Sequence, residues 1–187
     1  MKKTLLLASA ACIIATSANA KMWNNFDPYI GADYAYDNLN LKGDAKYARK
    51  NFNSAKINLG TDITQYSSWE AFYQFGGSRK AHLKESQGGG TKKFKFNAYG
   101  LDGYGYMPLG CEQKFSLVGT LGAAVYDTEL KHKNKITKSK VGYRIGGGAQ
   151  YKITDNISAR VIGRYSHVGT RDLKHLAEVT AGVRYSF

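Results

Sequence analysis

Ser166 and His167 form the one adjacent pair in the chain with the chemistry of a nucleophile and its general base. Adjacent residues of an extended segment point to opposite faces, so a hydrogen bond between this hydroxyl and imidazole is hard to form. His82, His132 and His175 fall in segments that we expect to be loops, with neither a carboxylate partner nor the spacing of metal ligands. We therefore predict no enzymatic activity, no cofactor and no metal site.

Charged residues recur at every second position of several apolar segments. Near the N-terminus, Asp33 and Asp37 alternate with Ala32, Tyr34 and Tyr36. A period of two is that of a β-strand with one apolar and one polar face. The same pattern predicts eight strands, at residues 30–37, 55–63, 69–76, 94–107, 115–126, 141–153, 157–165 and 179–187.

The connections between these strands alternate in length. Short connections are expected at 64–68, 108–114 and 154–156, long ones at 38–53, 78–93 and 128–140, and one of intermediate length at 168–175. This alternation predicts an all-β fold, an eight-stranded antiparallel up-and-down transmembrane β-barrel with short periplasmic turns and longer extracellular loops. A soluble barrel such as a lipocalin would bury its apolar face, but the polar face here carries too many charges to be exchanged for it.

The N-terminal residues have the organisation of a secretory signal peptide. Two lysines precede an apolar stretch at 5–18, and small residues lead to an expected cleavage site between Ala20 and Lys21. We expect two parts, a signal peptide at residues 1–20 and a single barrel domain at residues 21–187.

If the polar faces point inward, the lumen contains a balanced set of charges. An eight-stranded barrel has an interior only wide enough for side chains to fill, so we expect a paired network and not a wide pore. The six predicted acids and six predicted bases are Asp33, Asp37, Asp62, Glu70, Asp102 and Glu178 with Lys56, Arg144, Lys152, Arg160, Arg164 and Arg184. Lys56 and Lys152 are alternatively expected at the rims.

Aromatic and other large side chains cluster near the expected strand ends, as in the girdles that lie at the two membrane interfaces. We predict a periplasmic girdle of Tyr29, Met107, Tyr151, Tyr185 and Phe187, and an opposite girdle of Tyr36, Phe75, Tyr143 and Tyr165.

The last eight residues, 180–187, resemble the C-terminal recognition signal of bacterial outer-membrane barrels. The resemblance implies that Thr180, Gly182, Tyr185 and Phe187 are read by the barrel assembly machinery. Residues 104–109 and 151–160 also resemble strand-turn-strand segments of the OmpA-like and opacity-type eight-stranded barrel families. These families imply a location in the outer membrane and no single activity, and we expect no peptidoglycan binding, because the resemblance does not extend to the C-terminal soluble domain of full-length OmpA.

The longer connections are strongly basic, with 16 basic and 4 acidic residues in a chain of net charge +13. A surface of this kind attracts anions by long-range steering that salt weakens. The predicted basic surface comprises Lys42, Lys46, Arg49, Lys50, Arg79, Lys80, Lys84, Lys92, Lys93, Lys131, Lys133, Lys135, Lys138, Lys140, Arg171 and Lys174.

These features predict a structural or surface-interaction protein in contact with outer-membrane lipid and lipopolysaccharide phosphates. A host glycosaminoglycan or other acidic surface, bound in an adhesin-like way, is the second possible partner. Phe94 and Phe96 alternate with lysines as in nucleic-acid sites, but an outer-membrane location argues against nucleic acid. A small porin-like channel is the alternative function. A lipid A-modifying enzyme is less favoured, because Ser166-His167 lacks the His-x-Ser spacing of the lipid A deacylases.

Overall fold

The computed structural model describes residues 27–41, 51–76, 79–82, 91–110, 112–131, 135–168 and 173–187. No helix in these ranges is long and apolar enough to cross a membrane. The backbone of these ranges forms nine strands, which are β1 (Asp27–Leu41), β2 (Asn51–Thr64), β3 (Ser67–Gly76), β4 (Arg79–His82), β5 (Thr91–Leu109), β6 (Phe115–Lys131), β7 (Lys135–Lys152), β8 (Ile157–His167) and β9 (Leu173–Ser186).

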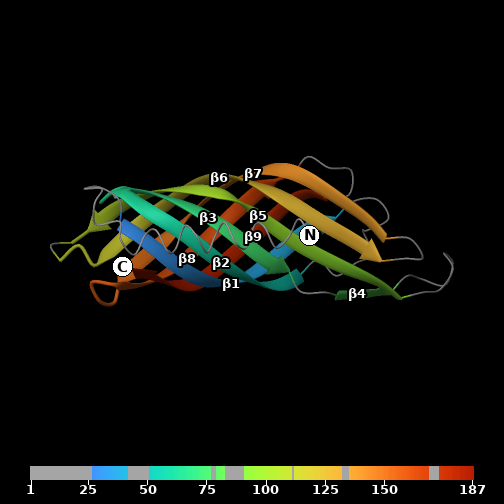
Figure 1. Ribbon diagram of the computed structural model, residues 1–187, viewed down its shortest axis with the longest axis horizontal. Helices are drawn as coiled ribbons and strands as arrows, with labels where there is room; N and C mark the ends of the chain where they lie inside the picture. Colours follow the sequence, from blue (N-terminus) through green and yellow to red (C-terminus); the bar gives the residue numbers. More distant parts are fainter. Residues whose placement is uncertain are drawn as a thin grey trace.

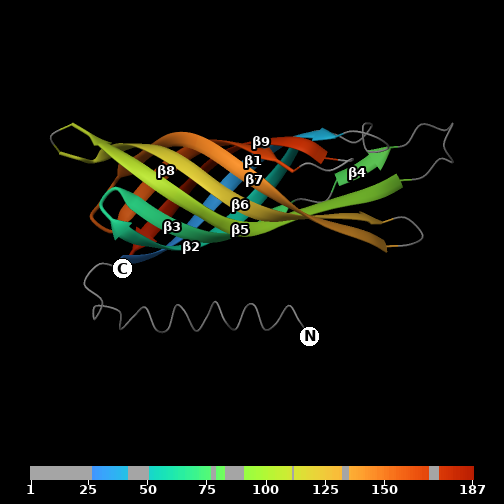
Figure 2. The same cartoon turned by 90° about the horizontal axis from the view of Figure 1, so that it is seen from above.

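The strands form one antiparallel sheet that closes on itself. The order is β3-β2-β1-β9-β8-β7-β6-β5-β4, and an additional pairing between β3 and β5 completes the circle. Both β3 and β4 pair with β5, so they occupy one position in the wall, which therefore has eight strands (Figures 1 and 2). The predicted eight-stranded antiparallel up-and-down barrel is confirmed.

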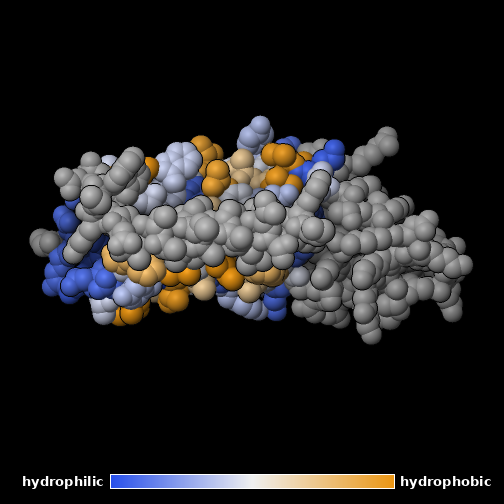
Figure 3. All heavy atoms as spheres, viewed as in Figure 1, coloured by the Kyte–Doolittle hydropathy of each residue, from blue (hydrophilic) through white to orange (hydrophobic). Residues whose placement is uncertain are grey.

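Side chains alternate between the two surfaces of this wall. Along β8, Arg160, Ile162 and Arg164 are buried, whereas Val161 and Tyr165 are exposed. The barrel therefore has charges inside and apolar groups outside, the reverse of a water-soluble core. Figure 3 shows hydrophobic side chains along the wall and hydrophilic ones at the end where the C-terminus lies.

Several strands are longer than the sequence predicted. β4 and the adjoining ends of β5, β6 and β7 extend beyond the rest of the barrel at the end opposite the C-terminus (Figures 1 and 2). The predicted loops at 78–93 and 128–140 are therefore wrong in extent. Their lysines alternate with Phe94, Leu130 and Ile136 in a strand-like period, which the charge of these segments obscured.

The glycine run 146–148 in β7 serves close packing and introduces no bulge, since the pairing with β6 and β8 continues through it without a shift. A Cβ atom on Gly148 would lie 2.0 Å from the backbone oxygen of Val161. The nearest atom to a Cβ on Gly147 would be 3.4 Å away. Within this run, close backbone contacts thus require glycine at Gly146 and Gly148, whereas Gly147 has room for a Cβ atom.

Candidate functional site

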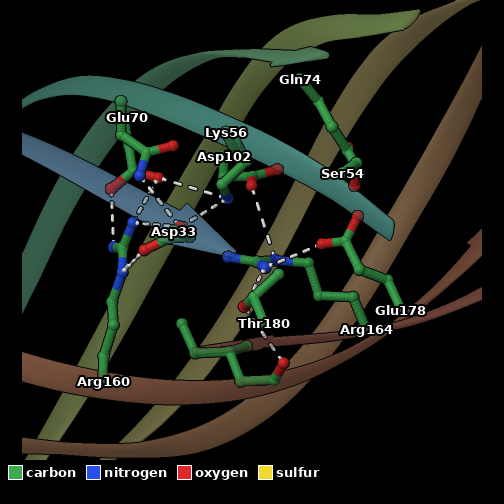
Figure 4. Close-up of polar contacts among 12 residues, drawn as sticks. Asp33, Ser54, Lys56, Glu70, Gln74, Asp102, Arg160, Arg164, Glu178 and Thr180 are labelled. Carbon is green, nitrogen blue, oxygen red and sulfur yellow. Dashed lines mark hydrogen bonds and ion pairs between the residues drawn. The ribbon is translucent and has the colours of Figure 1, made fainter. Parts of the chain in front are cut away.

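Arg160 of β8 points into the polar lumen and binds two carboxylates (Figure 4). Its Nε and Nη2 donate to Asp33 of β1 at 3.1 and 2.9 Å. Its Nη1 and Nη2 donate to Glu70 of β3 at 2.7 and 3.1 Å. Bidentate contacts of this kind hold the planar guanidinium in a fixed orientation. Arg160 therefore links three strands through the middle of the barrel.

Lys56 of β2 joins the same cluster from another side. Its Nζ lies 3.2 Å from Oδ2 of Asp33 and 3.7 Å from Oε1 of Glu70, and its side chain is fully buried. The ammonium is also 5.1 Å from the centre of the Phe72 ring, within the range of a cation–π contact. Two buried carboxylates thus face two buried cations here.

A second cluster of charged side chains lies nearer the end of the barrel where β5, β6 and β7 reach beyond the other strands. Arg144 and Arg164 each donate to Oε1 of Glu178 at 3.0 Å. They also face Asp102, at 3.3 Å from Arg144 Nε and 3.7 Å from Arg164 Nε. The carbon of the Arg144 guanidinium lies 4.3 Å from the Phe72 ring centre. Phe72 thus separates and packs against cations of both clusters.

The Tyr104 hydroxyl connects the two clusters. It donates to Oε1 of Glu70 at 2.9 Å and accepts from Nη2 of Arg164 at 2.7 Å. Arg164 also donates to the hydroxyl of Thr180 at 2.9 Å, which in turn donates to the carbonyl of Ile162 at 3.2 Å. The luminal side chains therefore form one continuous network.

Smaller polar groups complete the network at both ends. On the side of the extended strands, Asp37 accepts from the Ser54 hydroxyl and, at 3.1 and 3.2 Å, from the Gln74 amide. Near the short turns, Arg184 forms an ion pair with Asp62 and donates to the Tyr106 hydroxyl at 3.0 Å. Paired polar side chains therefore extend through the described lumen, alongside buried apolar residues such as Val118 and Ile162.

The structure brings together ten of the twelve predicted luminal charges as buried groups. Asp62 is half-buried at the end of the lumen with Arg184. Lys152 is exposed, as in the alternative placement at the rim. That rim alternative is wrong for Lys56, which lies in the central cluster.

Tyr29 corrects the predicted girdle. It was expected on the lipid-facing surface, but it is buried inside, where its hydroxyl donates to Glu70 at 3.2 Å and its ring packs 3.9 Å from the Arg184 guanidinium carbon. Alternation along β1 requires this, since Ile30 is exposed. The other eight predicted girdle residues are exposed, namely Met107, Tyr151, Tyr185, Phe187, Tyr36, Phe75, Tyr143 and Tyr165.

The four C-terminal signal residues divide between the two surfaces. Tyr185 and Phe187 are exposed on the wall, with ring centres 5.3 Å apart. Thr180 is buried in the network, and a Cβ on Gly182 would lie 2.0 Å from Oδ1 of Asp33. Thr180 and Gly182 therefore have packing roles that suffice to explain their residue types.

The Ser166 hydroxyl and the His167 imidazole lie on opposite sides of β8, because Ser166 is buried and His167 is exposed. They cannot act as a nucleophile and its base without rearrangement of the strand. The predicted loop positions of His82 and His175 are wrong, since His82 ends β4 and His175 belongs to β9. His132 lies outside the described residues.

Part of the predicted basic surface belongs to strands and not to loops. The residues concerned are Arg79, Lys80, Lys92, Lys93, Lys131, Lys135, Lys138, Lys140 and Lys174. Lys42, Lys46, Arg49, Lys50, Lys84, Lys133 and Arg171 lie outside the described residues, as do the predicted signal peptide and its cleavage site at Ala20 and Lys21.

Four lysines stand in one row across the extended sheet. Lys80 of β4 is the register partner of Lys93 of β5, Lys93 is the partner of Lys131 of β6, and Lys131 is the partner of Lys135 of β7. We call these four residues the lysine row. Along the backbone of β5, Lys93 is an even number of positions from the exposed Tyr99.

A closed antiparallel sheet with an apolar outer wall and a charged, filled lumen defines a transmembrane β-barrel. The chain belongs to the family described as outer membrane protein beta-barrel domain, whose model matches residues 4–187. It is thus an outer-membrane β-barrel protein. No curated protein matches the chain significantly.

Solved structures of outer-membrane barrels have the same fold. Neisserial surface protein A is 16% identical with a TM-score of 0.67, and the match covers 86% of this chain and 97% of that one. Ail of Yersinia pestis, solved in complex with the heparin analogue sucrose octasulfate, is 17% identical with a TM-score of 0.61 over 87% and 99%. The N-terminal barrel of Pseudomonas aeruginosa OprF is 13% identical with a TM-score of 0.56 over 85% and 97%.

Proposed function

We propose that the protein is a non-enzymatic surface-interaction barrel whose basic end contacts the phosphate groups of lipopolysaccharide. The lysine row carries this proposal. Its four positively charged residues are direct register partners on adjacent strands. The Cβ atoms of directly opposite residues lie about 4.5–5.5 Å apart, so one phosphate can contact the ammonium groups of two neighbouring lysines.

The electrostatic repulsion within the lysine row supports an anionic partner. Like charges directly opposite one another destabilise a sheet, and three such pairs follow in sequence here. The neighbouring positions do little to reduce this repulsion. Glu129 is the nearest acidic register position, but its partner is Lys95, and the apolar positions Phe94, Leu130 and Ile136 lie between Glu129 and the lysine row. A bound polyanion would remove the repulsion without changing the fold.

The register of the row favours lipopolysaccharide over a host molecule. In backbone register the row is an even number of positions from the exposed Tyr99 of β5, and the exposed residues of a membrane barrel wall face lipid. A sulfated glycosaminoglycan is the second candidate. The complex of Ail with a heparin analogue supports it, because the two barrels have the same fold.

Binding to lipopolysaccharide in mixed micelles tests the proposal. The variant Lys93→Gln/Lys131→Gln removes the central pair of the row, and Lys114→Gln/Lys152→Gln removes the same charge from the exposed short-turn end. We expect the first variant to bind more weakly than wild type and with a shallower salt dependence, whereas the second binds normally. Equal binding by both variants would reject the row as the contact.

The same preparations separate the two partners. Retention on a heparin column that falls in Lys93→Gln/Lys131→Gln while binding to lipopolysaccharide stays unchanged would favour the glycosaminoglycan. Loss of lipopolysaccharide binding after enzymatic removal of its phosphates would favour the first proposal. A porin-like role is less supported, because buried ion pairs such as Arg160–Glu70 cross the lumen.

We also propose that residues 1–20 are removed on export and that the assembly machinery reads the C-terminal strand. The basic and apolar N-terminal segment and the exposed Tyr185 and Phe187 support these steps. An intact mass that begins at Lys21, measured on protein extracted from the outer membrane, is the expected result for the first step. A mass that includes Ala20 would reject this cleavage site.

A further inference from the structure

His167 and His175 form a close pair on the outer surface of the barrel, near the ends of β8 and β9. They are direct register partners, and His167 is exposed. Their Nδ1 atoms lie 3.3 Å apart. The two ring centres are 5.1 Å apart with an interplanar angle of 49°, so the two nitrogens approach each other without the rings being stacked.

This separation fits two ligands of one metal ion. A tetrahedral zinc ion with Zn–N bonds of about 2.0–2.1 Å holds two nitrogen ligands about 3.3–3.4 Å apart. Without a metal, the same contact is a hydrogen bond in which the Nδ1–H of one imidazole donates to the Nδ1 of the other, so a metal ion would take the place of the shared proton. A neutral imidazole can bind a metal through either ring nitrogen, so Nδ1 is a suitable ligand atom.

The surroundings of the pair hold the rings in this arrangement. Tyr165 stacks on His175, with ring centres 5.3 Å apart and an interplanar angle of 26°. Tyr143 is the register partner of His167 on the other side. The β-strand backbone fixes the two Cα positions, so little ordering of the chain is needed when a metal binds.

We propose that His167 and His175 bind a divalent d-block metal, with Zn²⁺ as the preferred ion. Among the described residues no group of three or more His, Cys, Asp and Glu side chains is arranged to hold a metal. The pair would therefore supply two of four ligands, and water or an external anion would supply the others. The bound ion would link the last residue of β8 to the start of β9.

Zinc titration of the untagged, refolded barrel in detergent tests the site. The chain has 4 histidines, so His82→Ala/His132→Ala is a control that keeps only the pair. His167→Phe removes one ligand and retains an aromatic ring on the wall, and His175→Ala removes the other. Fast migration of the unheated protein on gels shows that each variant has folded.

One zinc ion per chain is expected for wild type and for the control. Each single variant should bind at least about 10-fold more weakly, since losing even a partner of a metal ligand costs about 10- to 100-fold. Zinc should also raise the unfolding temperature of wild type but not of His167→Phe, because an ion that binds only the folded state stabilises it. Binding that persists in both single variants, or that disappears in the control, would overturn the proposal.

Discussion

Arg160 and Glu70 meet across the lumen from opposite strands of the barrel, with Nη1 of the arginine 2.7 Å from Oε2 of the glutamate. Counting around the closed sheet in either direction, β8 and β3 are four strands apart. Both side chains are almost completely buried. The contact therefore spans the full width of the barrel and fills its centre.

Arg160→Leu should strongly destabilise the barrel. Among the described residues, the substitution would leave Lys56 as the remaining cationic partner of the Asp33 and Glu70 carboxylates. Breaking a buried ion pair in this way costs about 3–5 kcal/mol. Urea unfolding of the barrel refolded in lipid vesicles would measure the loss. Lys152→Leu removes the same charge from an exposed position and should have little effect.

Arg164→Leu should be less severe than Arg160→Leu. Arg144 still contacts Glu178 at 3.0 Å and Asp102 at 3.3 Å after this change. The loss should be about 1.5–3 kcal/mol, as for a hydrogen bond to a charged group. The two variants are compared in the same unfolding assay. If Arg164→Leu were the more destabilising, the assignment of the central position to Arg160 would be wrong.

Gly148→Ala and Gly147→Ala are neighbouring substitutions with different expected outcomes. A Cβ on Gly148 would meet the backbone oxygen of Val161 at 2.0 Å, so β7 or β8 would have to move. Gly147 faces outward with its nearest such contact at 3.4 Å. Overpacking typically costs about 1–3 kcal/mol. The gel-migration midpoint on heating should fall for Gly148→Ala only; an equal fall for Gly147→Ala would contradict the packing.

Phe187→Ala should reduce the amount of protein in the outer membrane while leaving refolding in detergent unchanged. The ring is exposed on the wall, so its removal costs little packing within the barrel. Phe115→Ala removes another exposed ring and serves as the control. Quantification in outer-membrane fractions gives the readout. Equal levels of the two variants would remove the support for recognition of the last residue.

Alternation along the strands predicted which residues face the lumen but could not predict their partners. Period two assigns Glu70 and Arg160 to the same side of the wall, yet their contact depends on the relative register of β3 and β8, which no local pattern contains. Tyr29 was misplaced because its aromatic, amphipathic character outweighed its parity. The exposed Ile30 beside it was the available signal.

For the basic segments, the sequence predicted the charge but not the secondary structure. Counting charges located the basic segments of the chain, but charge was taken to indicate loops where the backbone continues as strands. The lysine row appears only when three separate strand pairings are known, because Lys80 and Lys135 are far apart in the chain. The pair of His167 and His175 was missed for the same reason, since it depends on the register of β8 and β9.

The central claim is that paired charges close the lumen, so that the protein acts through its outer surfaces. Single-channel recording of the refolded barrel in planar bilayers tests this claim most directly. The network centred on Arg160, Glu70 and Tyr104 predicts no stable open steps for wild type. Stable, large conductance steps from the folded barrel would contradict the claim and favour a channel.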